Sequence, residues 1–230
     1  MKPYYSDESV TIYHGDCRDI LPSIGKVDLV LTDPPYGCNR QYGPEYDDSR
    51  AKYWDWFIPC FAQLRAAAPV LAMTHRQEAM KMLPDWDWVM CWHKPYGAMC
   101  RIGNSPVLPH WEPILLWGIH KLGTRRDVMP DVLSVNPEPS PQPGRKPMLK
   151  SKATCVNGEV TGHPLPKPIA LFKRLAAGLS LPGEMVVDPF AGSGTTLVAA
   201  KALGRKAIGI EITERYCEIA ANRCRQMVLL

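Results

Sequence analysis

The sequence predicts an α/β fold built on a doubly wound, largely parallel sheet. Short apolar runs that suit strands alternate along the chain with longer stretches that suit helices. Two of these runs, 27–32 and 184–187, pass into turns rich in Pro or Gly, as expected where strands end at the ligand-binding edge of such a sheet. The segment 121–162 breaks the alternation, so an irregular insertion rich in proline and basic residues is expected there.

The expected elements follow in chain order. Strands are expected at 9–13, 27–32, 69–73, 88–92, 113–117, 184–187 and 206–210, and helices at 48–67, 76–83, 167–179, 195–203 and 213–227. Because the carboxyl ends of parallel strands lie along one edge of a sheet, we expect Asp33 and Asp188 to lie side by side. The whole chain, 1–230, is interpreted as a single domain.

Composition is that of an ordinary globular protein. Of the 230 residues, 46% are hydrophobic and 22% are charged, and the net charge of +4 permits a polyanionic partner without demanding one. Apolar stretches fall short of the roughly 18 to 20 residues that cross a bilayer, and the N-terminal residues lack the apolar region of a signal peptide. We therefore expect a cytoplasmic protein without a membrane partner. The eight cysteines form no Cys-x-x-Cys pair, and no metal site is predicted.

The segment 33–36, Asp-Pro-Pro-Tyr, directly follows an apolar run. Proline fixes φ near about −65° and has no N–H, so the chain leaves the sheet stiffly while its carbonyls stay free to accept hydrogen bonds. The carboxylate of Asp33 and the carbonyl of Pro34 could accept both hydrogens of an exocyclic base amine, while Tyr36 stacks on the ring. A strand that simply ends in a proline turn explains the same residues, so this motif alone leaves both interpretations open.

A second segment, 188–196, reads Asp-Pro-Phe-Ala-Gly-Ser-Gly-Thr-Thr and lies between an apolar strand and a helical stretch. Gly192 and Gly194 would leave backbone N–H groups and a helix N-terminus facing a carboxylate or a phosphate. The glycine spacing and the absence of a following Lys argue against both a dinucleotide fingerprint and a P-loop. Glu211 ends the next strand, where an acidic residue commonly binds ribose hydroxyls; a surface carboxylate that opens the next helix is the alternative.

These two motifs, together with 163–168, His-Pro-Leu-Pro-Lys-Pro, resemble those of the DNA amino-methyltransferases that use S-adenosylmethionine. The catalytic motif precedes the glycine motif, as in the β group of that family. The resemblance implies a Rossmann-like methyltransferase fold with S-adenosylmethionine as cofactor. It covers both ends of the chain and weakens between about 118 and 160. Leu165 and Pro166 stand where the family often has polar residues, so side-chain contacts from these positions are not expected.

The resemblance also implies roles for individual residues. The catalytic loop would consist of Asp33, Pro34, Pro35 and Tyr36. The cofactor would be bound by Asp16, Cys17, Asp33, His163, Lys167, Asp188, Phe190, Ala191, Gly192, Ser193, Gly194, Thr195 and Glu211. Within this set Lys167 resembles the lysine that helps to hold the methionine carboxylate. Asp16 resembles the acidic residue near the cofactor adenine, although an N-cap for the next helix explains it as well.

Two segments are candidates for contact with DNA. The insertion 121–162 holds six prolines between Pro130 and Pro147 and more basic than acidic side chains. It suits the target-recognition region that the family places between its motifs; a solvated loop without specificity is the alternative. The segment 37–50 flanks the catalytic loop, where a side chain could fill the space left by a flipped base. The predicted nucleic-acid contacts are Arg40, Gln41, Tyr42, Lys94, Arg125, Arg126, Arg145, Lys146, Lys150 and Lys152.

The function that the resemblance implies is site-specific methyl transfer from S-adenosylmethionine to the exocyclic N6 of adenine in double-stranded DNA, after the base is flipped out. In this family Asp at the first position of the catalytic motif leans toward adenine and Ser toward cytosine N4, so an N4-cytosine enzyme is the first alternative. An RNA or protein methyltransferase and a non-catalytic DNA-binding protein of the same fold are further alternatives. A homodimer and a cognate restriction endonuclease stay open as partners.

Overall fold

The computed structural model describes residues 2–39, 48–49, 51–95, 110–123, 128–136, 155–156, 159–160 and 167–226. The strands are β1 (Tyr5–Ser6), β2 (Val10–His14), β3 (Leu29–Thr32), β4 (Val70–Thr74), β5 (Trp88–His93), β6 (Trp111–Trp117), β7 (Val132–Ser134), β8 (Cys155–Val156), β9 (Glu159–Val160), β10 (Met185–Asp188) and β11 (Lys206–Glu211). The helices are α1 (Cys17–Ile24), α2 (Tyr53–Ala67), α3 (Ala79–Met82), the 3-10 helix η1 (Ile119–Leu122), α4 (Ile169–Leu179), α5 (Thr195–Ala202) and α6 (Glu214–Gln226).

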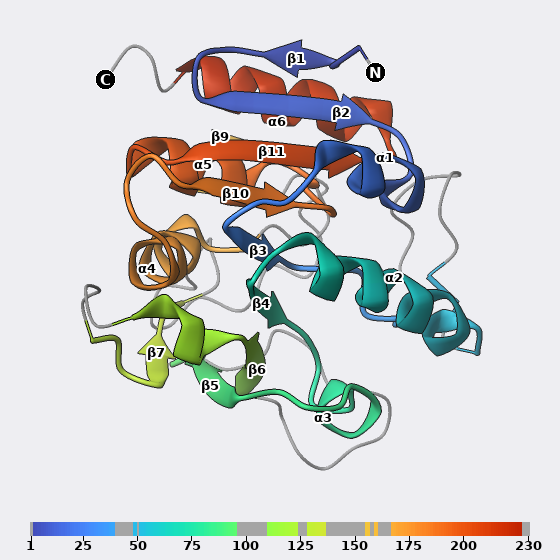
Figure 1. Ribbon diagram of the computed structural model, residues 1–230, viewed down its shortest axis with the longest axis vertical. Coiled ribbons are helices and arrows are strands. Elements are labelled where there is room, and N and C mark those ends of the chain that lie inside the picture. The colour runs from blue at the N-terminus through green and yellow to red at the C-terminus, as the bar shows by residue number, and fades with distance from the viewer. Residues whose placement is uncertain are drawn as a thin grey trace, which may run out of the picture.

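Nine of these strands form one twisted sheet in the order β1-β2-β11-β10-β3-β4-β6-β5-β7 (Figure 1). The five strands from β2 to β4 in this order are parallel to one another, and β7 is parallel to β5. Only β1 and β6 run against their neighbours in this sheet, β6 against both β4 and β5. The predicted largely parallel sheet is confirmed.

Helices cover both faces of the sheet, as a doubly wound fold requires. One face packs against α1 and α2, and the other packs against α4, α5 and α6 (Figure 1). Successive residues of the central strands therefore point into different apolar layers. In β3, Leu29 and Leu31 join the layer under α4 and α5, while Val30 joins the layer under α2. This two-sided burial explains why β3 reads as an unbroken apolar run.

Several elements differ from the sequence prediction: β1, η1, β8 and β9 are short elements that were not expected, and three larger differences bear on the fold. Helix α1 is absent from the helix ranges expected above, although Asp16 was considered as the N-cap of a helix here; Pro22 lies inside it and removes one backbone donor. The helix expected from 48 begins at Tyr53, and Asp48 instead accepts hydrogen bonds from the N–H groups of Gly37 and Cys38, at 2.7 and 2.8 Å. Strand β7 lies within the insertion expected to be irregular; it pairs with β5 and buries Leu133.

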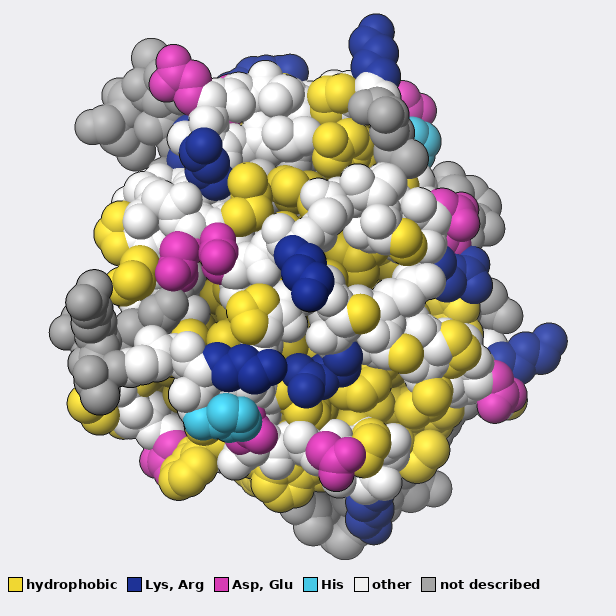
Figure 2. All heavy atoms as spheres, viewed as in Figure 1, with side chains coloured by type: hydrophobic (Ala, Val, Ile, Leu, Met, Phe, Trp, Pro, Cys, Tyr) yellow, Lys and Arg dark blue, Asp and Glu magenta, His cyan; other side chains and the backbone are white. Residues whose placement is uncertain are grey.

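Charged side chains are scattered over the face of the molecule that Figure 2 shows. Lys and Arg side chains lie there singly or in small groups among apolar and acidic ones, and they form no continuous basic surface on this face. Among the helices in the described parts of the chain, none combines the length and the apolar character that a membrane span needs.

Candidate active site

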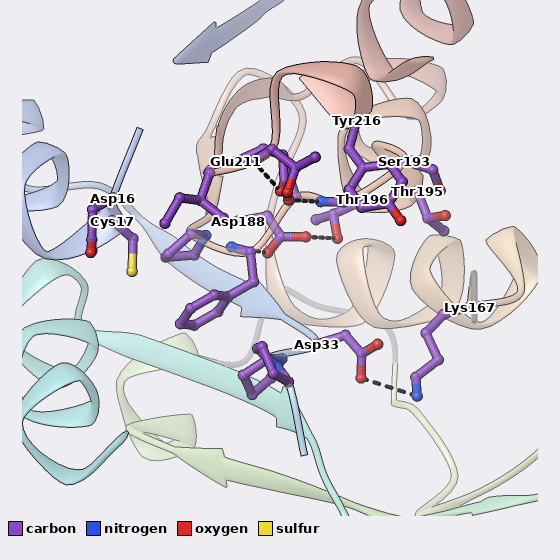
Figure 3. A pocket seen from close by; sticks show the side chains of 18 of the residues that line it. Asp16, Cys17, Asp33, Lys167, Asp188, Ser193, Thr195, Thr196, Glu211 and Tyr216 are labelled. Atoms are coloured by element: carbon purple, nitrogen blue, oxygen red, sulfur yellow. Dashed lines mark hydrogen bonds and ion pairs between the residues drawn. The ribbon is translucent and has the colours of Figure 1, made fainter. Parts of the chain in front are cut away.

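The two predicted motifs meet at the carboxyl edge of the sheet, between β3 and β10. These strands are parallel neighbours, with Val187 opposite Val30. From this point β3 leads through α2 to β4 on one side, and β10 leads through α5 to β11 on the other, so the strand order reverses here. The prediction that Asp33 and Asp188 lie side by side is confirmed. Both line one pocket, which Figure 3 shows from close by.

The carboxylate of Asp33 is held by three donors that all approach the same oxygen. Its Oδ1 lies 2.5 Å from Thr74 Oγ1, 2.8 Å from the Tyr36 hydroxyl and 3.1 Å from Lys167 Nζ. Among the described residues, none donates to Oδ2. Burial raises the pKa of Asp33, and the ammonium of Lys167 opposes this effect. The carboxylate thus has one fixed oxygen and a second oxygen that can accept a hydrogen bond from a ligand in the pocket.

The ring of Tyr36 is supported on one face by an aromatic stack. It lies on His75 with ring centroids 4.7 Å apart, and His75 stacks in turn on Trp54. His75 Nδ1 accepts from the N–H of Arg76, so Nε2 carries the proton and donates to the Tyr53 hydroxyl at 2.7 Å. Burial lowers the pKa of His75 to about 3, which keeps the ring neutral. The stack fixes the plane of Tyr36, and Lys167 Nζ lies over the same ring, 4.5 Å from its centroid.

Four charged side chains, Lys94, Glu112, Lys167 and Asp33, alternate in sign beside the pocket; we call them the charged quartet. Glu112 Oε1 pairs with Lys94 Nζ, and Oε2 lies 3.2 Å from Lys167 Nζ. Burial alone raises the pKa of Glu112, but the two lysines outweigh it and hold that pKa below its ordinary value. For Lys167 burial alone lowers the pKa, and the two carboxylates raise it above its ordinary value. Lys167 is therefore a cation that lies between two carboxylates.

The glycine loop, residues 189–194, is packed closely from behind. Gly194 has φ +81° and caps α5, and a Cβ atom at this position would lie 2.8 Å from the Cβ of Ala220 in α6. Arg223 of α6 is buried and donates to the backbone carbonyl of Ser193 at 2.6 Å. The loop backbone is thereby fixed at the N-terminus of α5, where N–H groups favour an anion.

Asp188 anchors the glycine loop to β3 through contacts within the protein. Its Oδ1 accepts from Thr32 Oγ1 at 2.5 Å and from the N–H of Phe190 at 3.1 Å, and its Oδ2 accepts from Thr196 Oγ1. Burial raises its pKa to about 6, against the lowering effect of the two threonine hydroxyls. Both carboxylate oxygens are used in the fold, so Asp188 shapes the pocket.

Glu211 ends β11 and presents its carboxylate to the same pocket. Oε2 accepts from the N–H of Gly192 and Oε1 accepts from the N–H of Thr213, both at 2.8 Å. Burial raises its pKa to about 7, although these backbone donors oppose that rise. The interpretation of Glu211 as a pocket residue is thus favoured over a surface carboxylate.

Asp16 and Cys17 line the far end of the pocket, at the start of α1. Asp16 is the N-cap: its Oδ1 accepts from the N–H of Arg18 at 2.8 Å, and the Arg18 guanidinium contacts both oxygens. These contacts with Arg18 lower the pKa of Asp16. The capping alternative is confirmed, and contact with an adenine ring stays a prediction. The thiol of Cys17 packs 3.6 Å from that of Cys60, and this contact with burial raises its pKa, so it is no nucleophile.

The structure brings most of the predicted site residues together. The pocket is lined by Asp16, Cys17, Asp33, Pro34, Pro35, Tyr36, Lys167, Asp188, Phe190, Ala191, Gly192, Ser193, Thr195 and Glu211. The predicted residues that lie outside the described part of the chain are Arg40, Gln41, Tyr42, Arg125, Arg126, Arg145, Lys146, Lys150, Lys152 and His163. Lys94 is described, but it is buried and paired with Glu112; its contact with DNA stays a prediction.

Sequence reasoning missed Thr74, His75, Glu112 and Arg223. Thr74 and His75 directly follow the apolar run of β4, as Asp33 follows that of β3, so the same rule could have found them. Glu112 lies near the start of a strand, whereas that rule selects residues at the ends of strands. Because β6 is antiparallel, its start lies at the edge where the parallel strands end.

Comparisons with known proteins agree with this geometry. A family model described as DNA methylase matches residues 90–222, which include Lys167, the glycine loop and Glu211. The chain is 28% identical over 261 residues to the type II methyltransferase M.ScaI of Streptomyces caespitosus, covering 96% of this chain and 83% of that protein. It is also 28% identical over 258 residues to the DNA adenine methyltransferase YhdJ of Escherichia coli strain K12, covering 95% and 84%.

Among solved structures, the PvuII DNA methyltransferase, described as cytosine-N4-specific, is similar with a TM-score of 0.69 at 20% identity. The match covers 96% of this chain and 88% of that one. At this identity the likeness shows a shared methyltransferase fold.

Proposed function

We propose, on the premise that this chain belongs to the DNA methylase family of S-adenosylmethionine-dependent amino-methyltransferases, that it transfers a methyl group to N6 of adenine in double-stranded DNA. One observation carries the proposal. A single pocket contains the Asp33 carboxylate, one oxygen of which accepts from no described residue, and a second carboxylate beside a glycine loop, on Glu211. The first suits a base amine, and the second suits the ribose of a nucleoside cofactor.

The pocket residues fit S-adenosylmethionine. The carboxylate of Glu211 can accept hydrogen bonds from ribose hydroxyls, and the N-terminus of α5 behind Gly194 favours a carboxylate group. Lys167 adds a cation to the pocket, and Phe190 adds an aromatic surface. When bound, the cofactor supplies a methyl group on a sulfonium, an electrophile that needs no covalent enzyme intermediate.

Asp33 and the Pro34 carbonyl would accept the two hydrogens of the target amine. Accepting both hydrogens turns the nitrogen lone pair out of conjugation with the ring, so the amine becomes nucleophilic through its geometry. Asp33 Oδ2 is the oxygen available for this contact, because Oδ1 already accepts from Thr74, Tyr36 and Lys167. Tyr36 lines the pocket beside Lys167, and its ring would stack on the base. Positioning and electrostatics then lower the barrier.

Adenine is favoured over cytosine as the target. The catalytic motif begins with Asp33, the residue type that leans toward adenine in the resembling family, and an adenine methyltransferase is among the relatives at 28% identity. N4 of cytosine is the second candidate, since its exocyclic amine offers the same two hydrogens to the same acceptors.

The target base must leave the duplex to reach this pocket, at a cost of a few kcal/mol. We assign target recognition to the insertion 121–162 and the filling of the vacated space to side chains of 37–50. The similarity of this chain to type II methyltransferases supports a restriction endonuclease as its cognate partner. We also propose a homodimer.

The test is to express the chain in a methylation-free host and to map modified bases by direct DNA sequencing. Methyl marks on adenine N6 at one recurring sequence are the expected result. The matched variants are Asp33→Ala, expected to abolish the marks, and Asp87→Asn, which removes a carboxylate outside the pocket and should keep them. Marks on cytosine N4 would overturn the choice of base, and methyl transfer to RNA or protein alone would overturn DNA as the substrate. Cofactor binding without any transfer would favour a non-catalytic protein.

A further inference from the structure

Glu112 is a partly buried carboxylate whose role the proposed chemistry leaves unassigned. Its strand β6 starts at the edge where the parallel strands end, and hydrogen bonds tie this start to both neighbours. The N–H of His75 donates to the Pro113 carbonyl at 3.2 Å, and the N–H of Lys94 donates to the His110 carbonyl at 2.7 Å. The backbone on both sides of Glu112 is thus fixed.

Each oxygen of the Glu112 carboxylate makes a different contact. Oε1 pairs with Lys94, the residue that directly follows β5, which anchors the side chain to the end of that strand. Oε2 lies 3.2 Å from Lys167 Nζ and 3.1 Å from the Tyr36 hydroxyl, two of the three groups that hold Asp33 Oδ1. Glu112 therefore supports Asp33 through two intermediaries and lies outside the pocket lining.

We propose that Glu112 is a positioning residue: it holds Lys167 and Tyr36 against one oxygen of Asp33, which leaves the other oxygen directed to the target amine. This inference rests on the proposed function, because it assigns Glu112 a part in methyl transfer. Without Glu112, Lys167 has Asp33 as its remaining carboxylate partner in the quartet, and its ammonium can move onto the oxygen that the amine needs. Lys94 would at the same time lose its partner while remaining buried.

The charged and titratable side chains around Asp33 also set its pKa. Four titratable groups face Asp33 from the surrounding elements: Lys167 from the segment before α4, Glu112 from β6, Tyr36 from its own loop and Asp188 from β10. Burial raises the pKa of Asp33, Lys167 lowers it and Glu112 raises it. Replacing Glu112 by Gln should therefore lower the pKa of Asp33, and replacing Lys167 by Met should raise it. The two substitutions are expected to act in opposite directions.

The test measures single-turnover methyl transfer against pH, with excess protein, saturating tritiated S-adenosylmethionine and DNA from a methylase-deficient strain. In the wild type the rate should fall at acid pH as Asp33 becomes protonated. Glu112→Gln should reduce the plateau rate about tenfold or more, from the lost charged hydrogen bonds, and move the fall to lower pH. Lys167→Met should move it to higher pH. Asp87→Asn, at the opposite edge of the sheet, should keep the wild-type pH profile.

The outcomes separate the two proposals. Wild-type transfer to DNA combined with an unmoved profile in Glu112→Gln would overturn the role of Glu112 and leave the proposed function intact. Absence of wild-type transfer at every pH would overturn both. If Glu112→Gln does not fold, Glu112→Asp replaces it: this variant keeps the charge but shortens the reach, so the plateau should fall while the profile stays in place. A wild-type plateau in Glu112→Asp would overturn the inference.

Discussion

The carboxylate of Glu211 makes cofactor binding sensitive to pH near neutrality. Its pKa of about 7 results from burial, opposed by hydrogen bonds from the N–H groups of Gly192 and Thr213. Ribose hydroxyls donate to the ionised carboxylate, so binding should strengthen as pH rises through this value. If only the ionised form binds, affinity at pH 6 should be about tenfold lower than at pH 8, or about 1.4 kcal/mol.

The assay is calorimetry from pH 6 to 8 with 5′-methylthioadenosine, a fragment of the cofactor that has the ribose diol and no group titrating in this range. Glu211→Gln should bind more weakly and show no such pH dependence. The 2′-deoxy analogue should lose most of the pH dependence with the wild type, because it lacks one donor. At pH 7 binding of 5′-methylthioadenosine should release protons, since binding favours the ionised form of the Glu211 carboxylate.

Two results would refute this reasoning. A flat profile in the wild type would show that Glu211 does not titrate in the binding range. A tenfold change that persists in Glu211→Gln would assign the pH dependence to another group, of which Asp188, with a pKa of about 6, is the nearest candidate.

Three further predictions concern the glycine loop and its supports. Gly194→Ala and Gly204→Ala both place a side chain at positive φ, which costs about 1 to 2 kcal/mol of stability each. Only Gly194→Ala also adds a close contact with α6. Calorimetry should show that cofactor binding is lost in Gly194→Ala and kept in Gly204→Ala. The pKa of Asp188 is raised from 3.8 to about 6, so its stabilising effect is present at low pH and lost as pH rises between these values. Asp188→Asn should remove about 2 kcal/mol of pH dependence between pH 4 and 7 in denaturant titrations, and an equal change in stability over this range in both proteins would contradict this. Arg223→Met should weaken cofactor binding about tenfold by freeing the loop, whereas Arg215→Met, exposed on the same helix, should not; equal affinities would exclude the clamping role.

The sequence predicted the sheet and the meeting of the two motifs because both depend on local patterns. Strands buried on two faces leave long apolar runs, and the residues that follow such runs share one edge, which placed Asp33 beside Asp188. Each of the seven expected strands is present, with shifts of at most two residues at their ends. Strand β7 was missed because only three residues pair there and prolines surround it.

The supports of the catalytic loop could not be predicted in the same way. The position of Glu112 depends on the direction of β6, and an apolar run does not reveal whether its strand is parallel or antiparallel. The role of Lys167 depends on the space between Asp33 and Glu112, which only the packed sheet defines. Arg223 reads as a charged residue of an amphipathic helix, and its burial against Ser193 comes from the tertiary fold.

The order of strands in the sheet also bears on how the protein is made. Strand β3 is synthesised early, yet one of its two neighbours in the sheet is β10, which is synthesised much later. In the same way, β2 pairs with β11, which is also synthesised late. While about the first four fifths of the polypeptide emerge from the ribosome, the central strands therefore have open edges that can pair with other nascent chains. The glycine loop directly follows β10 in the chain, so a product truncated before β10 lacks both the loop and the strand that pairs with β3. Such a product would be both inactive and prone to aggregate.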